Sequence, residues 1–323
     1  VFRGSGISLN ELTASLKEAS WEGILLASVS MLGFIYFEGE AVRVIVNHMG
    51  YPAKRSHGFV YSAADVYFSA ITPSASGGQP ASAFFMMKDG IPGTAVMAAL
   101  LLNLVMYTLA VVTLGLLNFV CAPRLFLQFS IVGRVLIISG MLALSGLAIL
   151  FYMLLKKREI VRKLMKGTAS FLRRIHCKRL AQKLEKKINK ALEEYGQCVS
   201  LIFNNKAMLI KVYVLNFLQR LSQILVTIVA FAALHGNIRT LPRLLATQIY
   251  VVLGSNCVPI PGGVGVTDYL MLNGYKQLME KTAAYQLEIL SRGLSFYVCI
   301  FVSMVTVVIG YLVQRKNTRE KMK

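Results

Sequence analysis

The sequence predicts an all-α polytopic membrane protein, organised as an inverted repeat with two Pro/Gly-broken, re-entrant helical hairpins. Three observations lead to this prediction. Hydrophobic residues make up 55% of the 323 residues and charged residues only 15%, whereas a soluble domain carries about 25% charged residues. Several apolar runs reach the roughly 20 residues that a helix needs to cross a bilayer. Two further apolar regions are interrupted in their middle by clusters of proline and glycine.

The unbroken apolar runs predict membrane-spanning helices. A polar, amphipathic surface helix at about 8–20 precedes them, and the first span begins at Trp21, an aromatic residue suited to the membrane interface. The runs are continuous rather than alternating, which favours helices over strands. We expect the spans at about 21–46, 93–121, 131–155, 207–235 and 289–314.

The two interrupted regions, 57–92 and 243–276, resemble each other. The first contains TPSASGGQP and the second VPIPGGVGV, each between two apolar arms. An arm of roughly 13–17 residues is about 20–25 Å long, which is short for a crossing of about 30 Å. Backbone freed by proline and glycine is tolerated at membrane depth only inside protein or beside a wet cavity. The pattern therefore predicts two re-entrant hairpins, and their corresponding positions indicate a transport site between them.

The charge distribution predicts the orientation of the chain. The net charge is +20, and fourteen basic residues between 156 and 190 are opposed by only two acidic ones. By the positive-inside rule, we expect the loop at 156–206 and the basic C-terminus on the cytoplasmic side of the cell membrane. Region 57–92 then enters from the cytoplasmic face and region 243–276 from the outer face, as an inverted repeat requires. The loop could also bind tRNA, but we favour a solvated hairpin at the membrane surface and expect no nucleic-acid partner.

The whole chain, 1–323, is interpreted as a single transmembrane domain, with a first repeat at about 1–125 and a second at about 126–323. The first repeat has one span fewer and the sequence begins with Val, so we expect a further span upstream. The five cysteines and four histidines are scattered, and we predict no disulfide framework, no metal site and no cofactor. An oligomer is compatible with the sequence but is not indicated by it.

Four segments of the chain carry a resemblance to a known family. They are ITPSASGGQPASAFFMMKDGIP, LQRLSQ, VPIPGGVGVTDYLML and LSRGLSFY, and they look like the lysylphosphatidylglycerol synthase transmembrane-region family over essentially the whole chain. The resemblance implies a flippase-like protein, and it implies an extra N-terminal span. The multiple-peptide-resistance synthases join this region to a large cytosolic aminoacyl-transferase domain. The sequence after the last predicted span has no room for that domain, so we expect no aminoacyl transfer by these residues.

The breaks in the two hairpins predict an anion-binding site. A helix that restarts at mid-membrane presents unpaired N–H groups and the positive end of its dipole. Arg220 and Arg292 lie in spans, and a guanidinium binds phosphate through two parallel bonds. Glu38 and Asp65 are candidate charge partners for these arginines, or counter-charges for a lysyl headgroup. The candidate headgroup-binding residues are Arg220, Arg292, Gly77, Gly78, Gln79, Gly262, Gly263, Thr267 and Asp268.

Plainer interpretations of these residues stay open. The glycines could serve only close helix packing, and the charges could form static structural pairs. No nucleophile–base pair or nucleotide loop is recognisable, so we predict no catalytic residue. We predict a lipid translocase that moves an anionic or aminoacylated phospholipid, or a polyprenyl-phosphate-linked lipid, between leaflets. The alternatives are a phosphatidylglycerol lysyltransferase-type enzyme or its membrane subunit, and a non-catalytic membrane adaptor.

Overall fold

The part of the chain that the structure describes is predominantly helical. The computed structural model describes residues 19–156, 192–258 and 260–321, and this part of the chain contains no strand. Five of its helical runs are long and apolar enough to cross a membrane. The protein is therefore an all-α polytopic membrane protein, as the sequence predicts. Nearly all of the expected surface helix at 8–20, and most of the basic loop at 156–206, lie outside the described residues.

The membrane-spanning runs occupy the predicted positions. They are α3 (Trp21–His48), α6 (Gly93–Cys121), α8 (Ile131–Lys156), α11 (Lys206–Ala233) and a last run of α14 (Lys281–Arg292), η4 (Gly293–Val298) and α15 (Cys299–Lys321). This last run begins earlier than the predicted residue 289. The chain stays helical through Gly293, whose φ of −52° is right-handed, because it widens there into the π-helix η4. Such π-helical turns inside long helices are frequent at functional positions.

Each interrupted region forms two packed helices joined by a 3₁₀ turn. The first consists of α4 (Arg55–Ile71), η1 (Pro73–Ala75) and α5 (Gly78–Lys88), and the second of α12 (Leu241–Ser255), η3 (Pro261–Gly263) and α13 (Val266–Tyr275). The longest of these helices, α4, has 17 residues, about 25 Å at 1.5 Å per residue. None of them reaches the ~30 Å of a full crossing. Short helices α7 (Pro123–Gln128) and η2 (Ile238–Thr240) connect neighbouring elements.

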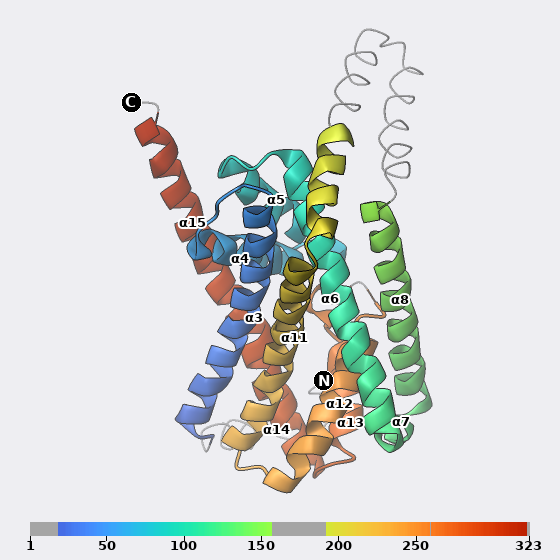
Figure 1. The fold of residues 1–323 in the computed structure, drawn as a ribbon. Helices are drawn as coiled ribbons and strands as arrows, with labels where there is room; N and C mark the ends of the chain where they lie inside the picture. Colours follow the sequence, from blue (N-terminus) through green and yellow to red (C-terminus); the bar gives the residue numbers. More distant parts are fainter. Residues whose placement is uncertain (1–18, 157–191, 259, 322–323) are drawn as a thin grey trace, which may run out of the picture.

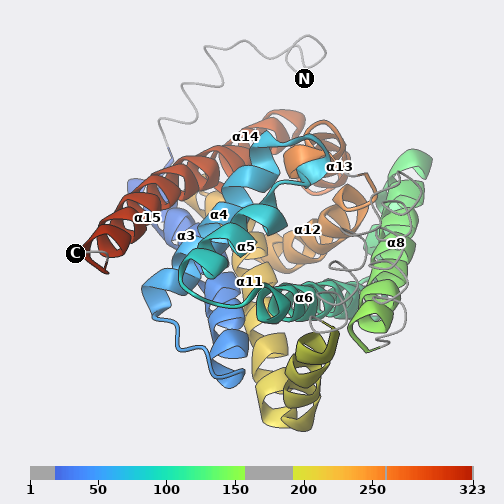
Figure 2. The ribbon, with the colours of Figure 1, turned by 90° about the horizontal axis from the view of Figure 1, so that it is seen from above.

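The tips of the two hairpins meet inside the molecule. The turn η1 contacts the turn η3, and α4 also contacts η3. Figure 1 shows the α4–α5 pair toward one end of the bundle, together with the C-terminal ends of α8 and α15, and the α12–α13 pair toward the other end. Seen from above, α15 and α8 lie on opposite flanks, with α4, α5, α11 and α12 between them (Figure 2). The hairpins thus approach each other from opposite ends.

Each hairpin has its own hydrophobic core. The core around the first hairpin includes Met31, Tyr61 and Met86, and the core around the second includes Tyr250 and Tyr275, all of them buried. Side chains with aromatic or flexible apolar groups fill such interiors at high density. The helical arms of each hairpin are therefore anchored in a packed core, while the residues of the two tips belong to neither core.

The first hairpin crosses α3 at very close range. A Cβ atom on Gly39 would lie 2.4 Å from the carbonyl oxygen of Gly58, and one on Gly58 would lie 2.5 Å from the carbonyl oxygen of Gly39. Only glycine at both positions permits this backbone approach, which is the small-residue packing typical of membrane helices. The close crossing brings the inner faces of α3 and α4 together, and both faces carry acidic residues.

Candidate functional site

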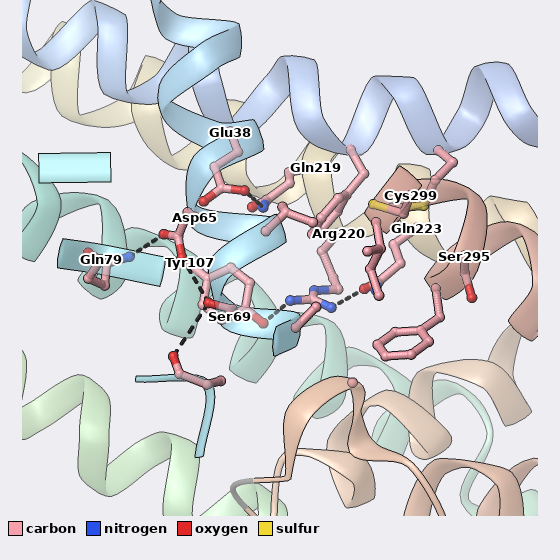
Figure 3. Close-up of a pocket in the computed structure, with 18 of the residues that line it drawn as sticks. Glu38, Asp65, Ser69, Gln79, Tyr107, Gln219, Arg220, Gln223, Ser295 and Cys299 are labelled. Atoms are coloured by element: carbon pink, nitrogen blue, oxygen red, sulfur yellow. Dashed lines mark hydrogen bonds between the residues drawn. The ribbon is translucent and has the colours of Figure 1, made fainter. Parts of the chain in front are cut away.

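A cavity of about 440 Å³ lies between the hairpin tips and the spans. Residues from α3, α4, α5, α6, α11, η4, α15 and both tips line it, and Figure 3 shows how their side chains converge. We call it the first cavity. Its polar lining residues are Glu38, Asp65, Ser69, Gln79, Asn103, Tyr107, Gln219, Arg220, Gln223 and Ser295. These polar residues come from six separate elements, α3, α4, α5, α6, α11 and η4, and they form one polar space within an apolar bundle.

Arg220 of α11 is the buried cation of this cavity. Its residue surface is only 5% exposed. One terminal nitrogen donates to Gln223 and the other to Tyr107, whose ring centroid lies 4.6 Å from the guanidinium carbon. The Nε atom is buried and has no hydrogen-bond partner. Within the described residues, no carboxylate oxygen lies within 4.0 Å of its guanidinium nitrogens. Among the described residues, the groups in contact with the charged Arg220 guanidinium are therefore neutral.

Two acidic residues face the same cavity from α3 and α4. Glu38 accepts hydrogen bonds of 3.0 Å each from the Ser62 hydroxyl and the Gln219 amide, both on Oε2. Asp65 accepts from the Ser69 hydroxyl at 3.1 Å and from the Gln79 amide. Both carboxyl groups therefore accept hydrogen bonds from neutral donors. The two acids do not form the contact ion pairs with arginines that the sequence suggested for them.

A second cavity of about 400 Å³ adjoins the first. Its own lining is rich in amides and hydroxyls, including Gln248, Asn256 and Thr267, and it contains Arg292. The residues that line both cavities are Ala75, Arg220, Gln223, Gly262, Ser295 and Phe296. The partition between the cavities therefore consists of the two hairpin tips, α11 and η4, with Arg220 accessible from both sides.

Arg292 has the carboxylate partner that Arg220 lacks. Its Nε lies 2.8 Å from Oδ1 of Asp268, and its Nη2 donates to the carbonyl of Gly262 at 3.0 Å. The other Asp268 oxygen accepts from the backbone N–H of Gly265 at 2.9 Å, at the first turn of α13. This acid both caps the helix and neutralises the arginine. The triad ties the last membrane-spanning run to the tip of the second hairpin.

Glycines at the second tip are required by the backbone. Gly262, Gly263 and Gly265 have φ values of 62°, 61° and 85°, a region that residues with a side chain rarely adopt. A Cβ on Gly262 would also lie 2.0 Å from a ring carbon of Phe296. The tip can therefore turn tightly against η4, and it exposes backbone to both cavities at Gly262.

The first tip is built differently. Gly77 lines a separate apolar groove of about 580 Å³ beside α15 and donates its N–H to the Thr72 hydroxyl at 2.9 Å. A Cβ on Gly78 would lie 2.0 Å from an Asp65 oxygen, so this glycine allows α5 to pack against α4. Neither glycine lines the two cavities. Gln79 alone of these predicted residues reaches the first cavity, where its amide binds Asp65.

The structure brings most of the predicted site residues to one place and adds others. Arg220, Glu38, Asp65, Gln79 and Gly262 line the first cavity, while Gly263, Thr267 and Arg292 line the second. Asp268 contacts Arg292 but is not among the lining residues of either cavity.

The sequence analysis missed several polar residues of the site. Gln219 and Gln223 flank Arg220 one residue before and three after it, which places them near one helix face. Tyr107 lies in a charge-free span, and nothing in its sequence context marks it. No group of three or more histidine, cysteine, aspartate or glutamate residues that could hold a metal occurs in the described ranges.

The chain matches the model of a known family. The family model described as the lysylphosphatidylglycerol synthase TM region matches residues 1–303. No curated protein matches the chain, and no solved structure does. The family match covers nearly all of the chain, including both hairpins and Arg220. The chain therefore belongs to the lysylphosphatidylglycerol synthase transmembrane-region family.

Proposed function

We propose that the protein moves an anionic membrane lipid, a phospholipid or a polyprenyl-phosphate-linked lipid, between the leaflets of the cell membrane. The observation that carries the proposal is Arg220, a buried guanidinium at the junction of two cavities that has no carboxylate oxygen within 4.0 Å in the described part of the chain. The family match agrees with a lipid-related membrane function. The class of lipid and its transfer between leaflets are what we propose beyond that match.

The energetics of Arg220 favour an anionic ligand. An arginine at the centre of a membrane helix costs about 2.5–3.5 kcal/mol on insertion scales. The hydrogen bonds to Gln223 and Tyr107 and the aromatic contact offset part of this cost. A phosphate would offset more, because charge-assisted hydrogen bonds are about twice as strong as neutral ones. The unpartnered Nε gives such a ligand a donor that is already in place.

The two cavities provide a polar route for a headgroup. They lie on either side of the hairpin tips and share Arg220, so a headgroup bound there could be reached from each cavity in turn. In this proposal the hairpins are re-entrant and open toward opposite faces, and movement of their tips gives alternating access. The loop at 156–206 and the C-terminus face the cytoplasm, as the positive-inside rule predicts.

Lipid transfer by Arg220 variants tests the proposal. The full chain would be placed in liposomes with fluorescent NBD-labelled phosphatidylglycerol, and transfer would be followed by dithionite quenching. Arg220→Ala should lower transfer by roughly 10- to 100-fold, the worth of a charged hydrogen bond of about 1.5–3 kcal/mol. Arg220→Lys should recover part of it, because an ammonium cannot form the paired contact.

The control is Arg239→Ala, which removes an exposed arginine of η2 outside both cavities. It should transfer lipid like the unaltered protein. Equal transfer by the Arg220→Ala and unaltered proteins, at equal amounts of folded protein, would overturn the proposed function.

A further inference from the structure

The first cavity contains more acidic than basic side chains. Glu38 and Asp65 oppose the single cation Arg220, and none of these three forms an ion pair within the described residues. The other titratable groups that face Glu38 are neutral ones, Tyr107 from α6 and Cys299 from α15. Two further charges on α3, those of Glu40 and Arg43, neutralise each other through bonds of 2.5 and 2.7 Å.

The surroundings of Gln219 independently favour a proton on the neighbouring Glu38 carboxyl group. It is only 2% exposed, it lines the cavity, and its amide nitrogen donates to Glu38. Its oxygen Oε1 is buried and has no donor. A buried acceptor without a donor is costly, and this one lies in the amide that already contacts the carboxylate. A protonated carboxyl group is a donor, and an amide can accept from it through its oxygen while its nitrogen still donates to the other carboxyl oxygen.

Glu38 is better placed than Asp65 to take up the proton. Both hydrogen bonds to Glu38 fall on Oε2, and no bond to Oε1 occurs in the described part of the chain. Asp65 uses both of its oxygens, one for Ser69 and one for Gln79. Protonation of Oε1 would leave the two bonds of Glu38 intact, whereas protonation of Asp65 would disturb one of its bonds.

An anion bound at Arg220 would leave an uncompensated charge in this space. With Glu38 and Asp65 ionised, the cavity carries one net negative charge, and a monoanionic phosphate would raise this to two. Like charges repel strongly in a space of low dielectric constant, and a buried unpaired charge is usually removed by protonation. Uptake of one proton restores the net charge of the unliganded cavity.

We propose that the lipid phosphate binds at Arg220 together with one proton from solvent, which Glu38 holds, so that lipid transfer is coupled to protons. This inference rests on the proposed function. It adds the coupling ion and the residue that carries it (Figure 3).

Binding of a soluble headgroup at different pH values tests the coupling. Short-chain dihexanoyl phosphatidylglycerol would be titrated into the detergent-solubilised full chain between about pH 5 and pH 9. The complex holds one proton more than the free protein, so the affinity should fall as the pH rises, by about tenfold per pH unit once the free carboxyl has ionised. Titration in buffers of different ionisation enthalpy would count the protons directly, with about one expected per lipid.

Two glutamine variants give the matched comparison. Glu38→Gln keeps an acceptor oxygen for Ser62 and Gln219 but cannot titrate, so its affinity should be independent of pH and should stay near the low-pH value of the unaltered protein. Glu40→Gln alters a neighbouring acid that is already paired with Arg43, and it should keep the full pH dependence.

The outcomes separate this inference from the proposed function. Binding that needs Arg220 but shows no pH dependence in the unaltered protein overturns proton coupling and leaves the lipid site standing. An unchanged pH dependence in Glu38→Gln shows that Glu38 is not the carrier and also overturns the inference. Loss of the Arg220 requirement itself overturns the proposed function.

Discussion

Arg220 and Arg292 are arginines in the membrane-spanning helices beside the hairpin tips, but their surroundings differ. The Arg292 guanidinium contacts the carboxylate of Asp268 at 2.8 Å and a tip carbonyl at 3.0 Å. Among the described residues, the Arg220 guanidinium donates to an amide and a phenol and lies near two aromatic rings, while its Nε has no hydrogen-bond partner. Removing one partner of a buried ion pair is destabilising because it leaves an uncompensated charge, whereas a buried charge with neutral partners can gain charge-assisted hydrogen bonds from a ligand of opposite charge. The two hairpins differ in the same way. Asp268 of the second hairpin forms an ion pair with Arg292, whereas Asp65 of the first hairpin accepts hydrogen bonds from Ser69 and Gln79.

The largest expected effect concerns the orientation of the hairpins and is all-or-none. In a chain whose five cysteines are replaced, single cysteines at Lys54 and Lys88 should react with an impermeant thiol reagent from the cytoplasmic side only. Cysteines at Arg239 and Lys281 should react from the outside only, because in the proposed topology each pair flanks one re-entrant hairpin. Labelling of either pair from opposite sides would mean that its hairpin crosses the membrane, and the comparison between two re-entrant hairpins would fail.

Breaking the Arg292–Asp268 pair should destabilise the protein. Arg292→Ala leaves a buried acid at the start of α13, and the side chains of the pair are only 13% and 12% exposed. Removal of one partner of a buried pair costs about 3–5 kcal/mol, and we expect about 2–3 kcal/mol here because part of the pair reaches solvent. Thermal unfolding in detergent measures it. The double variant Arg292→Met with Asp268→Asn should lose less than the sum of the single changes, and a fully additive loss would contradict the pairing.

A side chain at Gly262 should strain the second tip. Gly262→Ala forces a residue with a φ of 62° and places its Cβ 2.0 Å from Phe296, so we expect a loss of about 2 kcal/mol in unfolding free energy. Gly262→Ala in a Phe296→Ala background separates the two causes, because this background removes the ring and keeps the positive φ of residue 262. There the substitution should cost about 1 kcal/mol, from the left-handed backbone alone. An equal loss in both backgrounds would show that the contact with Phe296 does not hold the tip.

Tyr107→Phe should have the smallest effect. It removes one neutral hydrogen bond to Arg220 and keeps the ring, so stability should fall by about 1 kcal/mol or less. The matched control is Tyr269→Phe, which removes a surface hydroxyl bonded to Ser130 at 2.8 Å. A loss in Tyr107→Phe as large as that in Arg292→Ala would mean that the protein alone satisfies Arg220, and the contrast between the two arginines would disappear.

Sequence patterns were sufficient for the architecture but not for the partners within the site. The apolar runs predicted every membrane-spanning helix of the described residues, and the Pro/Gly clusters placed both tips, because these signals are local. Arg220 was identified because a charge in an apolar run is conspicuous. Its contact with Tyr107, 113 residues away, depends on how α6 packs against α11. Gly78 looked like part of an anion site, but its role in packing against Asp65 appears only when the two helices are side by side.

The measurement that tests the central claim most directly is an experimental structure of the full chain in lipid nanodiscs that contain phosphatidylglycerol. The account predicts phosphate density between the hairpin tips, within hydrogen-bonding distance of the Arg220 guanidinium, while Arg292 stays on Asp268. A contact ion pair between Arg220 and Glu38 or Asp65, with no phosphate in either cavity, would contradict it.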